Sequence, residues 1–123
     1  MKIGILTIGN ELTSGRTQDT NSSFLARAFS LQGWSVTLMM SVGDEDRAIK
    51  QALGYILAQS DAVVVTGGLG PTADDITTEA IARAFGLALH TDEAVLRHIR
   101  EIFEKYRLNW TENNAKQAVF PQG

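Results

Sequence analysis

Residues 62–77 read Ala-Val-Val-Val-Thr-Gly-Gly-Leu-Gly-Pro-Thr-Ala-Asp-Asp-Ile-Thr. The apolar run at the start is short, rich in β-branched residues and apolar on both faces, which favours a central strand of a sheet covered on both sides. The run stops at Gly67-Gly68, and a helical pattern begins after Asp75. A strand, a glycine loop and a helix start, in that order, expose backbone N–H groups to an anion at the helix N-terminus. The sequence therefore predicts a phosphate-binding loop.

The rest of the chain alternates between strand-like and helix-like patterns. Two further strands are expected at Lys2–Ile8 and Trp34–Met40, because both runs are short, apolar and bounded by turn residues. Apolar residues recur at helical spacing between the strands and after the third strand. This alternation is typical of an α/β fold with a parallel, doubly wound sheet. The expected helices carry their apolar residues at 24–31, 49–57, 81–85 and 95–106, with Gly33 and Gly86 ending the first and the third.

The C-terminal stretch, residues 111–123, looks irregular, with a short strand at Ala118–Phe120. Because the last three residues, Pro121-Gln122-Gly123, form a turn sequence, we expect the chain to be a piece of a longer protein.

Composition narrows the class of protein. The chain has 123 residues, of which 44% are hydrophobic and 20% charged, as in a single soluble globular domain. It has no cysteine, which excludes disulfides and thiolate metal sites and fits a cytoplasmic protein. The net charge of −3 and the lack of a basic run argue against nucleic acid as a partner, and no apolar run is long enough to cross a membrane.

The charge around the glycine loop is unusual for a phosphate site. No Lys or Arg lies between Lys50 and Arg83, and Asp74 and Asp75 stand where a Walker loop places its lysine. A phosphate would therefore be held by backbone N–H groups and the helix dipole. The carboxylates need another role, and the simplest is to hold a divalent cation such as Mg²⁺, shared with phosphate oxygens.

Two plainer interpretations remain open. Asp44, Asp74 and Asp75 each precede a helical pattern, so each could simply cap a helix. The glycines could merely allow tight turning. Two adjacent aspartates after three glycines favour a ligand site, since one can cap while the other faces the ligand.

Other polar residues are expected to lie at the same rim. In open α/β sheets, ligands bind beyond the carboxyl ends of the strands. Glu11 follows the first strand and Asp44 follows the second. One residue among Asp19, Thr20 and Asn21 should cap the next helix, and the others could reach a ribose or phosphate. Lys116 could supply the positive charge that the loop lacks, or it could be a solvated surface lysine.

Residues 66–77 resemble the signature of the CinA (competence/damage-inducible) family, whose N-terminal domain belongs to the molybdopterin-binding superfamily typified by MogA and MoaB. This motif is highly specific, and weaker ones follow the family order over nearly the whole chain. They are Gly9–Leu12 with Gly15, Asp19–Asn21, Val42–Asp44, and Asn114–Ala118 with Pro121 and Gly123.

The resemblance implies a three-layer α/β/α sandwich, usually a homo-oligomer. It implies one domain over residues 1–123, shortened at its C-terminal end and without the amidohydrolase domain that many members carry. It further implies metal-dependent hydrolysis of ADP-ribose to AMP and ribose 5-phosphate. The alternatives are a non-catalytic module that binds molybdopterin or a nucleotide, and a domain that mainly builds an oligomer.

The resemblance also suggests roles for individual residues. Asp75 and Asp44 would be catalytic and would hold the cation, for which Mg²⁺ is the first candidate and K⁺ a further one. Glu11 would be a third catalytic carboxylate. Contacts with the nucleotide or pterin are expected from Gly67, Gly68, Leu69, Gly70, Thr72, Asp74, Thr77, Asp19, Asn21 and Lys116.

Overall fold

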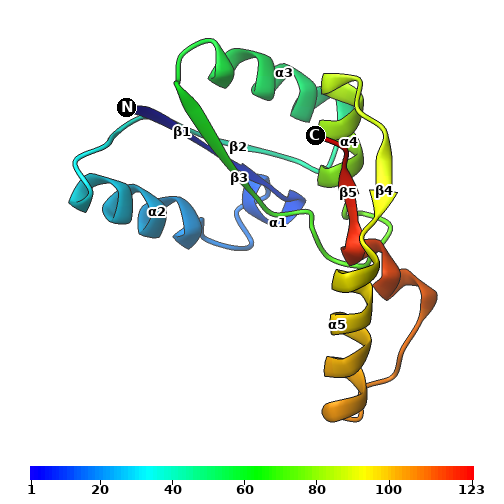
Figure 1. Ribbon diagram of the computed structural model, residues 1–123. Coiled ribbons are helices and arrows are strands. Elements are labelled where there is room, and N and C mark those ends of the chain that lie inside the picture. The colour runs from blue at the N-terminus through cyan, green and yellow to red at the C-terminus, as the bar shows by residue number, and fades with distance from the viewer.

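The computed structural model describes all of residues 1–123 as a sheet flanked by helices, from which an arm extends (Figure 1). The elements are β1 (Lys2–Ile8), α1 (Asn10–Thr13), α2 (Thr20–Leu31), β2 (Ser35–Val42), α3 (Asp46–Leu57), β3 (Ala62–Thr66), α4 (Thr77–Phe85), β4 (Leu89–Thr91), α5 (Glu93–Lys105), the 3₁₀ helix η1 (Glu112–Ala118) and β5 (Val119–Pro121). None of the helices combines the length and apolar character that a membrane span requires.

The main sheet has three parallel strands in the order β2-β1-β3. Strand β1 is central, and all residues from Ile3 to Gly9 are buried. The prediction that 62–66 is the central strand is wrong, because β3 pairs only with β1 and lies at the sheet edge. Its residues are apolar on both faces because helices cover both faces of the sheet, and all five are half-buried.

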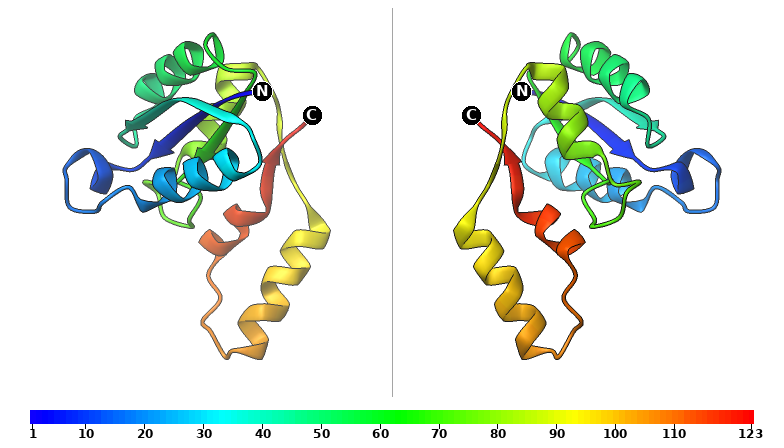
Figure 2. Two further views of the ribbon diagram at one scale, coloured as in Figure 1. Left: turned by 90° about the vertical axis from the view of Figure 1, so that its left-hand side faces the viewer. Right: turned by 90° about the vertical axis from the view of Figure 1, so that its right-hand side faces the viewer.

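Helix α2 lies on one face of the sheet and α3 on the other, so the predicted α/β fold with helices on both faces is confirmed (Figures 1 and 2). Leu6 and Ile8 of β1 pack with Ile49 and Ile56 of α3 in the core. Ile8, Ile49 and Ile56 are fully buried, and burial of each such side chain contributes roughly 1.5–3 kcal/mol to stability.

The other layer is more open. The apolar stripe predicted for the first helix covers the sheet only in part, since Phe24 and Leu31 of α2 are 73% and 81% exposed. The only fully buried residue of this helix is Ser22.

Chain turns and short elements agree in part with the predictions. Gly33 and Gly86, with φ of 78° and 65°, follow the ends of α2 and α4 as expected. Trp34 lies outside β2 and stacks on Phe29 with 5.6 Å between ring centroids. The irregular C-terminal stretch holds η1 and β5, and β5 pairs antiparallel with β4, a strand that the sequence did not predict.

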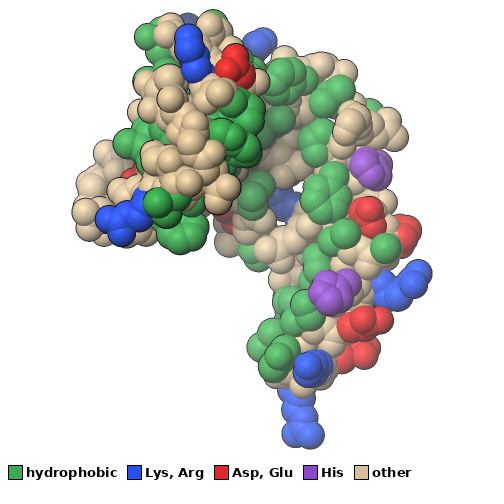
Figure 3. All heavy atoms as spheres, turned by 60° about the vertical axis from the view of Figure 1, so that its left-hand side comes forward, with side chains coloured by type: hydrophobic (Ala, Val, Ile, Leu, Met, Phe, Trp, Pro, Cys, Tyr) green, Lys and Arg blue, Asp and Glu red, His purple; other side chains and the backbone are tan.

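Helix α5 and η1 form an arm that stands off from the α/β body (Figures 2 and 3). No residue of α5 is fully buried. Within the arm, Phe103 meets Trp110 edge-on at 5.3 Å and Arg100 lies 5.0 Å from the Trp110 ring. The Asp92 amide donates to the Ala118 carbonyl at 2.8 Å, which closes the base of the arm.

Candidate functional site

The carboxyl ends of β1, β2 and β3 bring three loops to one rim, as predicted. Asp44, after β2, accepts a hydrogen bond through Oδ2 from the Asn10 amide (3.0 Å), and its own amide donates to Asn10 Oδ1 (2.9 Å). The other oxygen of Asp44, Oδ1, would lie 3.5 Å from a Cβ atom placed on Gly68. The first two loops are therefore hydrogen-bonded to each other, and the glycine loop lies beside them. Asn10 was assigned no role from the sequence, and its position in the first weak motif was the only signal.

Close packing requires glycine at the start of the loop. Gly67 and Gly68 have φ of 91° and 64°, in the region that favours glycine. A Cβ atom on Gly67 would overlap the carbonyl oxygen of Ile8, and one on Gly68 would overlap the hydroxyl of Thr77. That hydroxyl donates to the Gly67 carbonyl at 2.8 Å, and Thr77 is 1% exposed. Predicted as a ligand contact, Thr77 here fastens the glycine loop to the start of α4.

The alternative that the loop aspartates are helix caps is wrong. Helix α3 has Glu45 at its N-cap position and α4 has Ile76, and neither makes a side-chain capping bond. Asp44 and Asp75 therefore lie before the caps. Asp74 is exposed and makes no side-chain hydrogen bond within the protein.

Asp75 folds back over the preceding turn. Its Oδ2 accepts hydrogen bonds from the Thr72 hydroxyl (2.6 Å) and the Thr72 amide (3.0 Å). The Thr72 hydroxyl is the largest influence on the pKa of Asp75, which lies below its usual value. Burial opposes this shift, whereas the amides of Thr72 and Gly70 and the charge of Lys116 support it. A Cβ atom on Gly70 would lie 2.6 Å from Oδ2, so the glycine backbone and Thr72 form a cradle for an ionised carboxylate.

Lys116 reaches this cradle from η1. Its Nζ donates to the carbonyl oxygens of Thr72 (3.0 Å) and Asp75, and lies 3.6 Å from Oε1 of Glu79. The loop thus has a positive charge beside it, although its own sequence holds none. A contact between Lys116 and a phosphate stays a prediction. Glu79 was missed, and nothing in the sequence distinguished it from other acids of a first helical turn.

Nine of the thirteen predicted site residues line two small hollows, whereas Asp44, Thr72, Asp74 and Thr77 line neither. The first has about 130 Å³ and is lined by Gly68, Leu69, Gly70, Asp75, Thr78, Lys116, Gln117, Val119 and Phe120. The second has about 140 Å³ and is lined by Ile8, Glu11, Leu12, Thr17, Gln18, Asp19, Thr20, Asn21, Thr66 and Gly67. Gly68 borders the first hollow and its neighbour Gly67 borders the second, so the two hollows lie on either side of the glycine loop.

Asp19 is a structural residue of the second hollow. It caps α2 as predicted for one of the three residues there, accepting the Ser22 amide at 3.0 Å. Burial would raise its pKa, but hydrogen bonds from Ser22, Thr7 and Ser41 outweigh burial and lower it. Asn21 lies near the end of β3, with Nδ2 3.5 Å from the Thr66 hydroxyl.

The chemistry of the donor set limits how a cation could bind. No three His, Cys, Asp or Glu side chains are grouped so that they could hold a metal ion by themselves. Asp44 and Asp75 each use Oδ2 in the hydrogen bonds to Asn10 and Thr72, and each presents Oδ1 beside a loop glycine. The residues therefore fit Mg²⁺ only in the form that shares the ion between one or two carboxylates and ligand phosphates.

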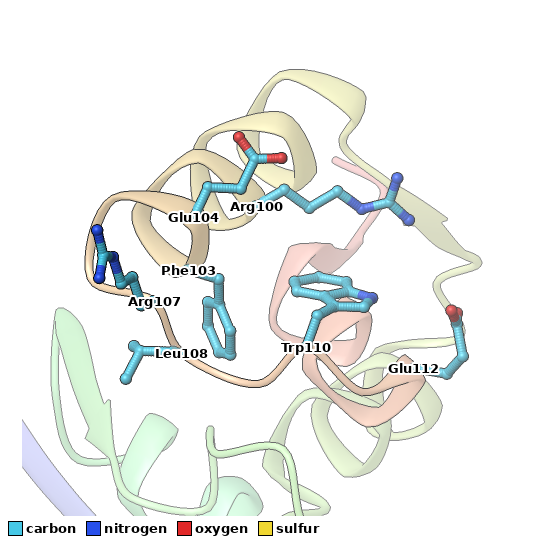
Figure 4. Close-up of a pocket in the computed structure, with 7 residues that line it drawn as sticks. All are labelled: Arg100, Phe103, Glu104, Arg107, Leu108, Trp110 and Glu112. Atoms are coloured by element: carbon cyan, nitrogen blue, oxygen red, sulfur yellow. The ribbon is translucent and has the colours of Figure 1, made fainter.

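The largest hollow lies elsewhere, on the arm (Figure 4). It has about 540 Å³ and is lined by the apolar side chains of Phe103, Leu108 and Trp110 and by four charged residues. None of the predicted site residues borders it.

Comparison with known proteins shows the family of the chain. A family model described as a probable molybdopterin binding domain matches residues 4–122. A CinA-like protein of Syntrophus aciditrophicus is 62% identical over 123 residues, which are all of this chain and 29% of that protein. A CinA-like protein of Dictyoglomus thermophilum is 42% identical over 123 residues, again all of this chain, and 30% of its own length. The chain thus spans less than a third of these relatives.

Solved structures give the same result. CinA of Thermoplasma acidophilum superposes with a TM-score of 0.86 at 36% identity, covering 98% of this chain and 70% of that one. The molybdopterin biosynthesis enzyme MoaB of Thermus thermophilus shares the fold, with a TM-score of 0.61 at 24% identity over 82% of this chain and 63% of its own. The chain belongs to the family of CinA-like proteins, as a domain of the molybdopterin-binding type.

Proposed function

We propose that this domain binds the pyrophosphate of a nucleotide such as ADP-ribose and hydrolyses it to AMP and ribose 5-phosphate with the help of a divalent cation. One observation carries the proposal: Asp44 and Asp75 flank the glycine loop, and neither is used as a helix cap. The resemblance of residues 66–77 to the CinA signature supplies the ligand class.

The protein groups have distinct proposed tasks. Backbone N–H groups of the loop bind phosphate oxygens, as anions bind at helix N-termini. Asp44 and Asp75 hold Mg²⁺, with K⁺ as a further candidate, and the ion supplies Lewis-acid stabilisation of charge on the phosphoryl group. Glu11, exposed at the rim, accepts a proton from the attacking water. The water oxygen bonds to one phosphorus, and the bridging oxygen leaves with the other.

The test is AMP release from ADP-ribose with MgCl₂, followed by chromatography. We expect Asp75→Asn to lower kcat by about 100-fold or more, as for removal of a group that stabilises the transition state. Asp61→Asn is the matched control, because Asp61 also accepts one backbone amide (Lys2, 2.7 Å) but lies at the opposite end of β3. Chelation of the metal should abolish release. Full activity of Asp75→Asn would refute its role.

A second candidate is a binding module for molybdopterin or a nucleotide without turnover. It is favoured by the match of residues 4–122 to a probable molybdopterin binding domain. Saturable binding of ADP-ribose or molybdopterin by the wild-type chain, with no AMP release under any metal tested, would select this candidate over the enzyme.

The assembly proposed is a homo-oligomer in the cytoplasm. The exposed Phe24 and Leu31 side chains support the homo-oligomer, because their spacing of seven residues puts both on one face of α2, which a second copy would cover. Light scattering of the purified chain tests it, and a monomer at all concentrations would contradict it.

A further inference from the structure

Lys116 connects two parts of the chain that are far apart in sequence. It lies on η1 at the base of the arm, and its ammonium group contacts the glycine–aspartate loop more than 40 residues earlier. The side chain is half-buried and borders the hollow that also contains Asp75 and Gly70. It is the only Lys or Arg side chain that lines either of the two rim hollows.

Two backbone carbonyls take most of the bonding capacity of Nζ. An ammonium group has three N–H donors. Two go to the carbonyl oxygens of Thr72 and Asp75, and the remaining neighbour is Glu79 Oε1 at 3.6 Å. The other Glu79 oxygen, Oε2, is buried and has no hydrogen-bond partner, so Lys116 is the cation that compensates this carboxylate. The third donor makes no hydrogen bond within the protein.

The two carbonyls belong to the turn that shapes the Asp75 cradle. The Asp75 amide donates to the Thr72 carbonyl at 3.1 Å, while the Thr72 amide and hydroxyl donate to the Asp75 carboxylate. Lys116 binds the carbonyls at both ends of this four-residue turn. Holding both ends fixes the direction in which the carboxylate points.

We propose that Lys116 is a positioning residue: it clamps the Thr72–Asp75 turn from η1 and so orients the Asp75 carboxylate toward the ligand. The proposal rests on the proposed function for its effect on turnover, whereas its structural half is independent of any activity. It differs from a phosphate-contact role, in which Nζ itself would bind the ligand and the main loss in a variant would be in affinity.

The structural half is tested by amide hydrogen exchange in Lys116→Met. We expect the Thr72 and Asp75 amides to exchange about tenfold faster or more, because loss of the clamp lowers the local opening free energy. Lys50→Met, on the exposed surface of α3, is the matched control and should leave both amides unchanged. Glu79→Gln keeps the two carbonyl contacts and should preserve most of the protection. Unchanged exchange in Lys116→Met would overturn the proposal.

The functional half is tested by separating binding from turnover. In Lys116→Met we expect kcat for AMP release to fall at least tenfold while the Kd for inorganic pyrophosphate changes less than threefold. A raised Kd with an unchanged kcat would overturn the proposal in favour of a phosphate contact. If the wild-type chain releases no AMP, the proposed hydrolysis fails, and the amide exchange result still decides the clamp.

A measurement on the intact protein covers the case in which Lys116→Met does not fold. The Lys116 ammonium should give a slowly exchanging ¹⁵N NMR signal, unlike the free ammonium of Lys50. Saturation with pyrophosphate should leave that signal in place if Nζ stays on the carbonyls. A rapidly exchanging signal, or a large shift that reports a direct contact with pyrophosphate, would overturn the clamp.

Discussion

The substitution Gly70→Ala tests whether the position of one carboxylate controls the site. Gly70 is not among the glycines with positive φ, so alanine is compatible with its backbone conformation. The added Cβ atom would lie 2.6 Å from Asp75 Oδ2 and 3.1 Å from its Cγ. Because real Cβ contacts below 3.0 Å are essentially never seen, the carboxylate must move by at least about 0.4 Å. The substitution therefore acts first on Asp75, which holds the three atoms nearest to the added Cβ.

The displacement breaks or lengthens the two hydrogen bonds from Thr72. A net hydrogen bond contributes about 0.5–1.5 kcal/mol, and this carboxylate is only half-buried, so we expect a loss of about 1–2 kcal/mol in the free energy of unfolding. The effect on turnover should be larger, since a misplaced catalytic group of this kind costs about 100-fold.

Urea unfolding and AMP release measure the two effects. Gly54→Ala is the control, because nothing lies within 4 Å of a Cβ atom at that exposed helical position. It should raise the free energy of unfolding by roughly 0.5–1 kcal/mol and leave turnover unchanged. If Gly70→Ala keeps both full stability and full turnover, the cradle has no influence on Asp75 and the reasoning is wrong.

Three further outcomes are expected. Gly67→Ala should lower the free energy of unfolding by roughly 2–6 kcal/mol, from backbone strain at φ 91° and overlap with the Ile8 carbonyl, as measured in urea. Thr77→Val should cost about 1–3 kcal/mol, because the Gly67 carbonyl loses its buried donor, and calorimetry can check this. Burial raises the pKa of Asp19, but hydrogen bonds to the carboxylate outweigh burial and hold this pKa below its ordinary value of 3.8. Its contribution is thus present at neutral pH and lost as pH falls through the folded pKa. Acid titration of unfolding should accordingly show a shallower loss of stability below about pH 4 in Asp19→Asn than in wild type.

The three parallel strands were predictable because each is a short apolar run bounded by turn residues. The place of β3 was not predictable from its own residues. A strand covered by helices on both faces is apolar throughout, whether it lies at the centre or at the edge of the sheet. The edge position of β3 is known only from its pairing, which is with β1 and no other strand. Helix α1, with four residues, and β4, with three, are too short for either periodicity to show.

For the candidate site, the sequence predicted which loops meet but not how their side chains bond. The order of the strands puts Glu11, Asp44 and the glycine loop at one rim in any parallel sheet. The contact of Lys116 with two backbone carbonyls depends on the path of the arm, which no local pattern encodes. Charge alone suggested a phosphate partner for this lysine, whereas the structure gives it acceptors within the protein.

The closed base of the arm has a consequence for how the chain tolerates change in length. Thr91 pairs directly with Val119, and the Asp92 amide bonds the Ala118 carbonyl, so residues 92–118 form a single excursion tied at its neck. Insertions or deletions near the tip, around Asn109, leave that neck and the lysine beside it in register. The tip is therefore the natural place to attach a label or a fusion partner. A change in chain length there should disturb the candidate site least.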